Sequence, residues 1–207
     1  MTRNSSTQEA ILTSARRHFM KHGFKDASLN RIVSDAGFTK GAFYGYYKSK
    51  EELFDALVEQ TSEELVELLG SITSGWSAYA EADQMQHLDE AFFQQLPRLA
   101  DFIVSHRDDL RLILTKAQGT RYEGFTDSLV ENNIEHIEPM LDRAGLSGVD
   151  RDTYRLLMTA YYGVLSQVVT GDYGRERIIR MIHDVQIVFQ NGILSLAKQQ
   201  DTQEKAA

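Results

Sequence analysis

Apolar residues recur at intervals of three and four along most of the chain, which is the spacing of one face of an α-helix. Near the start, four residues keep this spacing, namely Ile11, Leu12, Ala15 and Phe19. No segment alternates apolar and polar residues as a half-buried strand does, and only two prolines interrupt the 207 residues. The pattern therefore predicts an all-α protein of about nine helices.

The first fifty residues divide into three short helices. Gly23 stands where a left-handed residue ends the first helix, and Ser28 can cap a second helix that stops near Gly37. Thr39 can cap a third helix through about Tyr46. Two helices joined by a tight, glycine-containing turn form a helix-turn-helix, whose last helix enters the major groove of DNA.

The rest of the chain predicts a larger helical domain. Ser49 and Glu52 fit a capping box that begins a long helix, and the Gly/Ser-rich segment 70–79 predicts a loop after it. Further helices are expected at 83–105, 108–118, 122–144, 150–170 and 174–197. We expect a DNA-binding domain at residues 1–50 and a ligand-binding and dimerisation domain at 51–207.

The stretch GFTKGAFYGYYKSKEEL, residues 37–53, interleaves glycine, aromatic and cationic residues. Gly41 leaves room for the backbone to approach a phosphate or a base edge. A glycine inside a helix costs about 1 kcal/mol relative to alanine, so a glycine here indicates that the space is needed. Phe43 and Tyr47 are expected to anchor the third helix to the core. The side chains expected to reach phosphates are Lys40, Lys50, Tyr44 and Tyr46.

The net charge of −8 is unevenly distributed. Residues 1–50 hold nine Lys and Arg against three acidic residues, a net charge of +6, and the remainder carries −14. A basic head on an acidic body predicts a polyanionic partner for the head alone. Architectural DNA binding without sequence preference is disfavoured, because it needs a more basic chain.

The segment SLNRIVSDAGFTKGAFYGYYKSKEEL, residues 28–53, resembles the DNA-binding segment of the TetR family of bacterial transcriptional regulators. The turn, glycine, tyrosine and terminal lysine fall in register, whereas Ala42 replaces the usual Thr or Ser and Tyr46 the frequent His. The resemblance implies a homodimer, most often a repressor, that binds a palindromic operator and leaves it when a small molecule enters the second domain. We assign the DNA-binding surface to Ser28, Thr39, Lys40, Gly41, Ala42, Tyr44, Tyr46 and Lys50.

The last two expected helices carry apolar residues on two faces, which favours a core side and a partner side in a four-helix dimer bundle. The expected core stripe of the last helix is Ile178, Met181, Ile182, Val185, Val188, Phe189, Ile193 and Leu196. The expected dimer interface is Leu156, Ala160, Gly163, Ile179, Ile187 and Leu194. The alternative is a monomer that buries both faces internally.

The middle helices hold more aromatic and methionine residues than a simple bundle core needs. As a set they can line a mostly apolar pocket with a few polar contacts. The expected ligand-binding residues are Phe92, Leu96, Gln118, Arg121, Tyr122, Phe125, Met158, Tyr161 and Tyr162. They predict a hydrophobic or aromatic small molecule, anionic ones included, whereas ordinary core packing is the alternative for each residue taken singly.

Other classes of function lack their signals in the sequence. His18 and His22 have a spacing that can hold a metal, but no third ligand lies nearby and the chain has no cysteine, so solvent or phosphate contact is expected. Neither a phosphate-binding loop nor a nucleophile elbow occurs, so we predict no enzyme, metal or cofactor. The polar start and the lack of a membrane-length apolar run predict a cytoplasmic protein. The competing hypothesis is a helical small-molecule-binding protein without operator binding.

Overall fold

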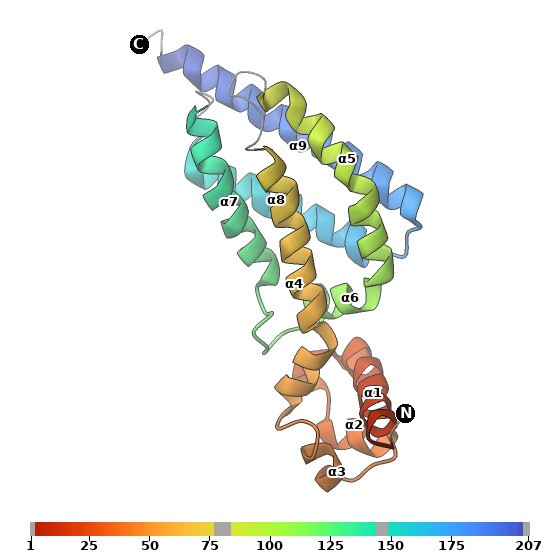
Figure 1. The fold of residues 1–207 in the computed structure, drawn as a ribbon. Helices are drawn as coiled ribbons and strands as arrows, with labels where there is room; N and C mark the ends of the chain where they lie inside the picture. The colour runs from red at the N-terminus through yellow and green to blue at the C-terminus, as the bar shows by residue number, and fades with distance from the viewer. Residues whose placement is uncertain (1–2, 77–83, 144–148, 205–207) are drawn as a thin grey trace. The chain divides into compact units, whose positions relative to one another are not determined.

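The computed structural model describes residues 3–76, 84–143 and 149–204. Within these ranges the chain forms nine α-helices and no strand, which confirms the all-α prediction (Figure 1). None of the helices described has both the length and the apolar composition of a membrane span. The helices are α1 Arg3–Asp26, α2 Leu29–Asp35, α3 Lys40–Tyr44, α4 Lys50–Trp76, α5 Gln84–Ser105, α6 Arg107–Thr115, α7 Phe125–Arg143, α8 Arg151–Thr170 and α9 Arg175–Glu204.

The chain divides into two compact units. The first contains Met1–Leu65 and His106–Glu123, and the second contains Val66–Ser105 and Gly124–Ala207. The first unit therefore extends beyond residue 50, because α6 packs against α1 and the N–H of Phe24 donates to the carbonyl of Lys116 at 2.8 Å. Such a contact joins segments far apart in sequence, which composition and helix caps do not reveal.

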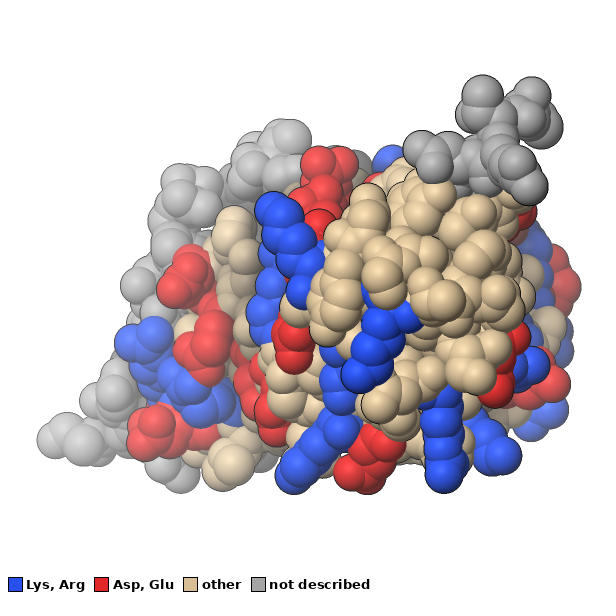
Figure 2. Space-filling view, turned by 90° about the horizontal axis from the view of Figure 1, so that it is seen from below, with Lys and Arg blue, Asp and Glu red and all other residues tan. Residues whose placement is uncertain are grey.

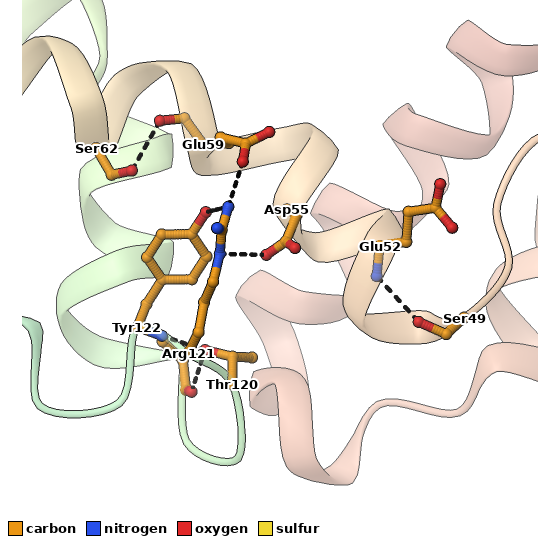
Figure 3. Close-up of polar contacts among 9 residues, drawn as sticks. Ser49, Glu52, Asp55, Glu59, Ser62, Thr120, Arg121 and Tyr122 are labelled. Carbon is orange, nitrogen blue, oxygen red and sulfur yellow. Dashed lines mark hydrogen bonds and ion pairs between the residues drawn. The ribbon is translucent and has the colours of Figure 1, made fainter.

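Local sequence rules account for the helix ends in the first unit. Gly23 has φ +75°, a backbone that favours glycine, and interrupts α1 near its end. The hydroxyl of Thr39 accepts from the N–H of Ala42 at 3.3 Å and caps α3. The hydroxyl of Ser49 accepts from the N–H of Glu52 at 3.1 Å at the start of α4 (Figure 3). These contacts fix where the short helices begin and end.

The core of the first unit is aromatic. Phe19, Phe24 and Phe54 are at most 3% exposed, and their ring centroids lie 5.2 to 5.8 Å apart. Tyr122 adds a fourth ring, 6.0 Å from Phe54, from the segment that follows α6. Each such ring buries a large apolar area, so this cluster ties α1, α4 and the segment after α6 into one body.

In the second unit, α9 packs against α5 and α8, and α8 also packs against α7. A buried cluster at these contacts consists of Val130, Ile134, Tyr154, Met158 and Tyr161. The loop expected at 70–79 was wrong for residues 70–76, which continue α4, whereas 77–79 lie outside the described residues. A single helix glycine costs about 1 kcal/mol, too little for Gly70 to end so long a helix.

The two faces expected on α9 need a correction. Val188 is 69% exposed and Leu196 36% exposed, although both were expected in the core stripe. Ile179 and Leu194, expected on the partner side, are half-buried. The cause is geometric, because the cluster is contacted by the i, i+4, i+8 row that begins at Val185, and neighbouring rows turn away from it.

Candidate nucleic-acid interface

The first helix of the helix-turn-helix, α2, is fixed on α1 by polar contacts. The hydroxyl of Ser14 donates to the carbonyl of Ile32 at 2.8 Å. His18 Nε2 lies 2.9 Å from Asp35 Oδ2, and Arg17 reaches the same oxygen at 3.1 Å. The hydrogen bond with His18 holds the pKa of Asp35 below its ordinary value. These contacts hold the last turn of α2 in place before the chain enters the turn.

His18 was expected to face solvent or phosphate, and this was wrong, because its side chain is 9% exposed beside α2. The signal was present in the sequence, since Ile11, Ala15 and His18 share one helix face. His22, in contrast, is exposed. In the part of the chain that the structure describes, no three His, Cys, Asp or Glu residues are grouped to hold a metal ion.

The third helix is anchored through one side and exposed on the other. Phe43 is fully buried and Tyr47 is 4% exposed, which confirms that these two residues anchor α3. The amide of Gln8 donates to the hydroxyl of Tyr47 at 3.2 Å and ties this anchor to α1. Tyr44, which follows Phe43 in the sequence, is 56% exposed. The helix therefore presents a polar, aromatic edge on a rigid base.

The three glycines around α3 have different reasons for being there. Gly37 has φ +82°, which the turn between α2 and α3 requires. A Cβ at Gly45 would lie 3.3 Å from the carbonyl oxygen of Ala42, so the fold itself favours glycine. A Cβ at Gly41 would meet only the hydroxyl of Thr39, in ordinary contact at 3.8 Å. Within the described chain, nothing requires a glycine at position 41.

Most of the expected DNA-contacting residues are accessible at the surface. Ser28, Thr39, Lys40, Gly41 and Tyr44 are exposed, and Ala42 and Tyr46 are partly so. Ser28 precedes α2, but its hydroxyl forms no capping bond to the described backbone of that helix. Figure 2 views the end at which Figure 1 draws α3, and Lys and Arg side chains, with Asp and Glu between them, border a surface of other residues there.

Sequence reasoning counted the cations of residues 1–50 but did not assign most of them to the surface. The exposed ones beyond the expected set are Arg17, Lys21, Lys25, Arg31 and Lys48. The net charge of +6 in residues 1–50 was the signal that could have found them. Positive side chains in such numbers are suited to neutralise a phosphate backbone.

Lys50 departs from the phosphate contact that the sequence suggested. Its ammonium donates to three backbone carbonyls of the same unit, those of Phe24, Lys25 and Ala27, at 2.7, 3.3 and 3.2 Å. It also lies 4.3 Å from the centre of the Phe24 ring. An ammonium has three donors, and all three have acceptors within the fold.

Three of the expected ligand-binding residues lie in the first unit instead, and two of them, Arg121 and Tyr122, form a polar network there (Figure 3). Arg121 forms ion pairs with Asp55 at 3.2 Å and with Glu59, and donates to the hydroxyl of Tyr122 at 2.8 Å. The hydrogen bond to Glu59 raises the pKa of Arg121. Gln118 is exposed in the same segment. The guanidinium is therefore matched by two carboxylates and is no longer an argument for an anionic ligand.

The other expected ligand-binding residues lie in the second unit, where only some of them meet. Met158 and Tyr161 belong to the buried cluster, and Tyr162 packs against it. Burial raises the pKa of Tyr162 to about 12, and it also raises that of Tyr161. The hydroxyl of Tyr161 donates to the side-chain oxygen of Gln186 at 2.6 Å. Phe92 and Leu96 are buried on α5, and Phe125 is half-buried at the start of α7.

Comparison with known proteins concentrates on the first unit. Residues 11–57 match the sequence model described as bacterial regulatory proteins, tetR family. The Transposon Tn10 TetC protein of Escherichia coli is 34% identical over 76 residues, which are 35% of this chain and 39% of that protein. The HTH-type transcriptional repressor AcnR of Corynebacterium diphtheriae is 32% identical over 68 residues, which are 33% and 36%. The chain thus spans less than half the length of these relatives.

The whole fold has counterparts among solved structures. One is NalD, the secondary repressor of the MexAB-OprM multidrug efflux pump in Pseudomonas aeruginosa, with a TM-score of 0.53 at 19% identity. The similarity covers 93% of this chain and 95% of that one. At this identity the likeness concerns the fold, namely an N-terminal helix-turn-helix followed by further helices.

Proposed function

The chain belongs, through residues 11–57, to the tetR family of bacterial regulatory proteins, and from that membership we propose that it is a sequence-specific, DNA-binding transcriptional regulator. In this proposal the protein is cytoplasmic, because the DNA that it binds lies in the cytoplasm. In this proposal α3 is the recognition helix, laid into the major groove, and the surrounding Lys and Arg side chains neutralise phosphates.

The observation that carries the proposal is the exposed edge of α3 on its buried anchors. Lys40 and Tyr44 supply a cation and a hydroxyl on a helix that Phe43 and Tyr47 hold rigidly. Gly41 lies between them, and nothing in the described fold accounts for a glycine there. A surface that a second macromolecule approaches closely accounts for all three exposed residues together.

The functional unit in this proposal is a homodimer on a palindromic operator, because two-fold symmetry in the protein matches inverted half-sites in DNA. The second unit supports it with exposed large apolar side chains on α8 and α9. Leu156 is 71% exposed and Val188 69% exposed, and three more residues share this property, namely Val164, Ile187 and Leu196. Ala160 and Gly163 are exposed on α8 near Leu156 and allow another helix to approach.

Control by a small molecule is the remaining part of the proposal, with the chain acting as a repressor that its effector releases. The buried residues around Met158 and Tyr161 are apolar with neutral hydroxyl and amide groups, which suits an uncharged hydrophobic or aromatic effector. Phe125→Ala should then weaken the binding of the effector and leave the affinity for the operator unchanged. A broad screen of such compounds in which none alters operator affinity or melting temperature argues against effector control.

The discriminating experiment for the function as a whole is salt-dependent binding to DNA that the purified protein has selected. A regulator binds its selected duplex about 10³-fold or more tightly than unrelated DNA at physiological salt. A helical small-molecule-binding protein with an incidental basic surface gives no such ratio. Equal affinity for the selected and unrelated duplexes therefore rejects the proposal in favour of that alternative.

A further inference from the structure

We propose that Lys50 is a positioning residue for operator binding, which caps the end of α1 and thereby fixes α3, rather than a phosphate ligand. The inference rests on the proposed function, since it concerns how the recognition helix is held. It reverses the role that the sequence alone assigned to this lysine.

The contacts of the ammonium carry the inference. Lys50 Nζ lies 2.7 Å from the carbonyl oxygen of Phe24 and 3.2 Å from that of Ala27, and the carbonyl of Lys25 is at 3.3 Å. The carbonyls of Phe24 and Lys25 lie in the last turn of α1, after its interruption at Gly23, and that of Ala27 follows directly. Carbonyls at a helix end lack partners within their own helix. The lysine is therefore a C-terminal cap supplied by a residue 26 positions away.

The same side chain is held from a second direction. Its ammonium lies 4.3 Å from the centroid of the Phe24 ring, which is 3% exposed and packs against Phe54. Reaching a phosphate would leave three carbonyls and this ring without their cation, and a partly buried acceptor is costly to leave unpaired. The fold therefore favours the inward position of Lys50.

The position of Lys50 in the chain explains why this matters for DNA recognition. It is the first residue of α4, and α3 ends at Tyr44 just before it. The intervening segment is held by the buried ring of Tyr47 and by the capping bond between Ser49 and Glu52. Lys50 joins this segment directly to the end of α1, so the orientation of α3 on the first unit depends on it.

The chain offers a matched control in Lys48, an exposed lysine two residues earlier. We suggest comparing Lys50→Met, Lys50→Arg and Lys48→Met in the full-length protein. The measurements are the unfolding midpoint and, well below that temperature, the affinity for the selected operator and for an unrelated duplex across a salt series.

A positioning role predicts a specific pattern. Lys50→Met binds operator about tenfold more weakly at every salt concentration, with an unchanged salt slope and unchanged affinity for unrelated DNA. Lys50→Arg does not restore operator affinity, because a planar guanidinium does not reproduce a compact ammonium among three carbonyls. Lys48→Met removes the same charge from the surface, so it weakens binding to both duplexes alike. It leaves the ratio of operator to unrelated binding and the unfolding midpoint unchanged.

A phosphate ligand predicts the opposite, and its pattern would overturn the inference. Lys50→Met would then lower the salt slope of binding by about 0.9 and weaken the affinity for both duplexes alike. Lys50→Arg would bind the operator as tightly as the parent. A lower unfolding midpoint with an unchanged binding ratio also overturns it, leaving a merely structural cap. If the parent selects no preferred sequence, the proposed function fails on its own. The capping role of Lys50 is then judged by the unfolding midpoints. Equal unfolding midpoints for Lys50→Met and Lys48→Met reject that role.

Discussion

Replacing Gly41 by alanine should make the protein more stable and a worse DNA binder at the same time. Gly41 is the second residue of α3, is exposed, and has no positive φ. Alanine is the better helix former, so the two effects of one added methyl group have opposite signs.

The magnitude of each effect follows from the surroundings of the added carbon. Within the chain it would lie 3.8 Å from the hydroxyl of Thr39, an ordinary contact, so no strain offsets the gain. The free energy of unfolding should rise by about 0.4–1 kcal/mol. In the complex, the methyl group stands between the helix and the DNA, and losing one close contact should weaken operator binding by about 1–3 kcal/mol.

Denaturant unfolding and operator titration on the same preparations test this. The control is Gly70→Ala in α4, where a new Cβ would meet no described heavy atom within 4 Å. It should raise stability similarly and leave operator affinity unchanged. If Gly41→Ala gains stability and still binds operator as tightly as the parent, the reasoning about the exposed edge of α3 is refuted.

The remaining predictions concern the recognition helix, the dimer and the buried tyrosines. Lys40→Ala and Tyr44→Ala should each weaken operator binding by about 1–3 kcal/mol with unchanged helix content and dimerisation, and an undiminished affinity in either variant speaks against α3. Gly163→Arg should lower dimer formation, measured by sedimentation, and operator affinity together, because it adds an unpaired charge to the proposed apolar interface; a monomeric variant with full operator affinity contradicts the coupling. Burial raises the pKa of Tyr162 from 10.0 to about 12, so its contribution to stability is complete below pH 10 and is lost as the pH rises through 12. In an absorbance titration, ionisation of Tyr162 near pH 10 in the still-folded protein is the contrary result.

Features that depend on neighbouring residues could be predicted from the sequence. Thr39 and Ser49 cap their helices because each hydroxyl reaches an N–H three residues later. Phe43 and Tyr47 stand four apart and so share the buried face of the segment around α3. These rules are local, and they were enough to recognise the helix-turn-helix and the edge of α3 that faces outward.

What could not be predicted depends on contacts between distant segments. Arg16 forms an ion pair with Asp109, 93 positions away, and Asp109 also accepts from the hydroxyl of Thr61 at 3.1 Å. No local pattern pairs these residues, so α6 was not assigned to the first unit. The same applies to Lys50 and Arg121, whose charges are paired with carbonyls and carboxylates that are distant in sequence.

The most direct test of the central claim is to select binding sites from random duplex DNA with the purified protein and to sequence what is retained. A regulator of this kind should enrich one motif with two inverted half-sites, about one helical turn or a multiple of it apart. Lys40→Ala should enrich that motif less strongly while remaining folded. Retained DNA without any common motif, bound equally by the parent and by Lys40→Ala, would contradict the account.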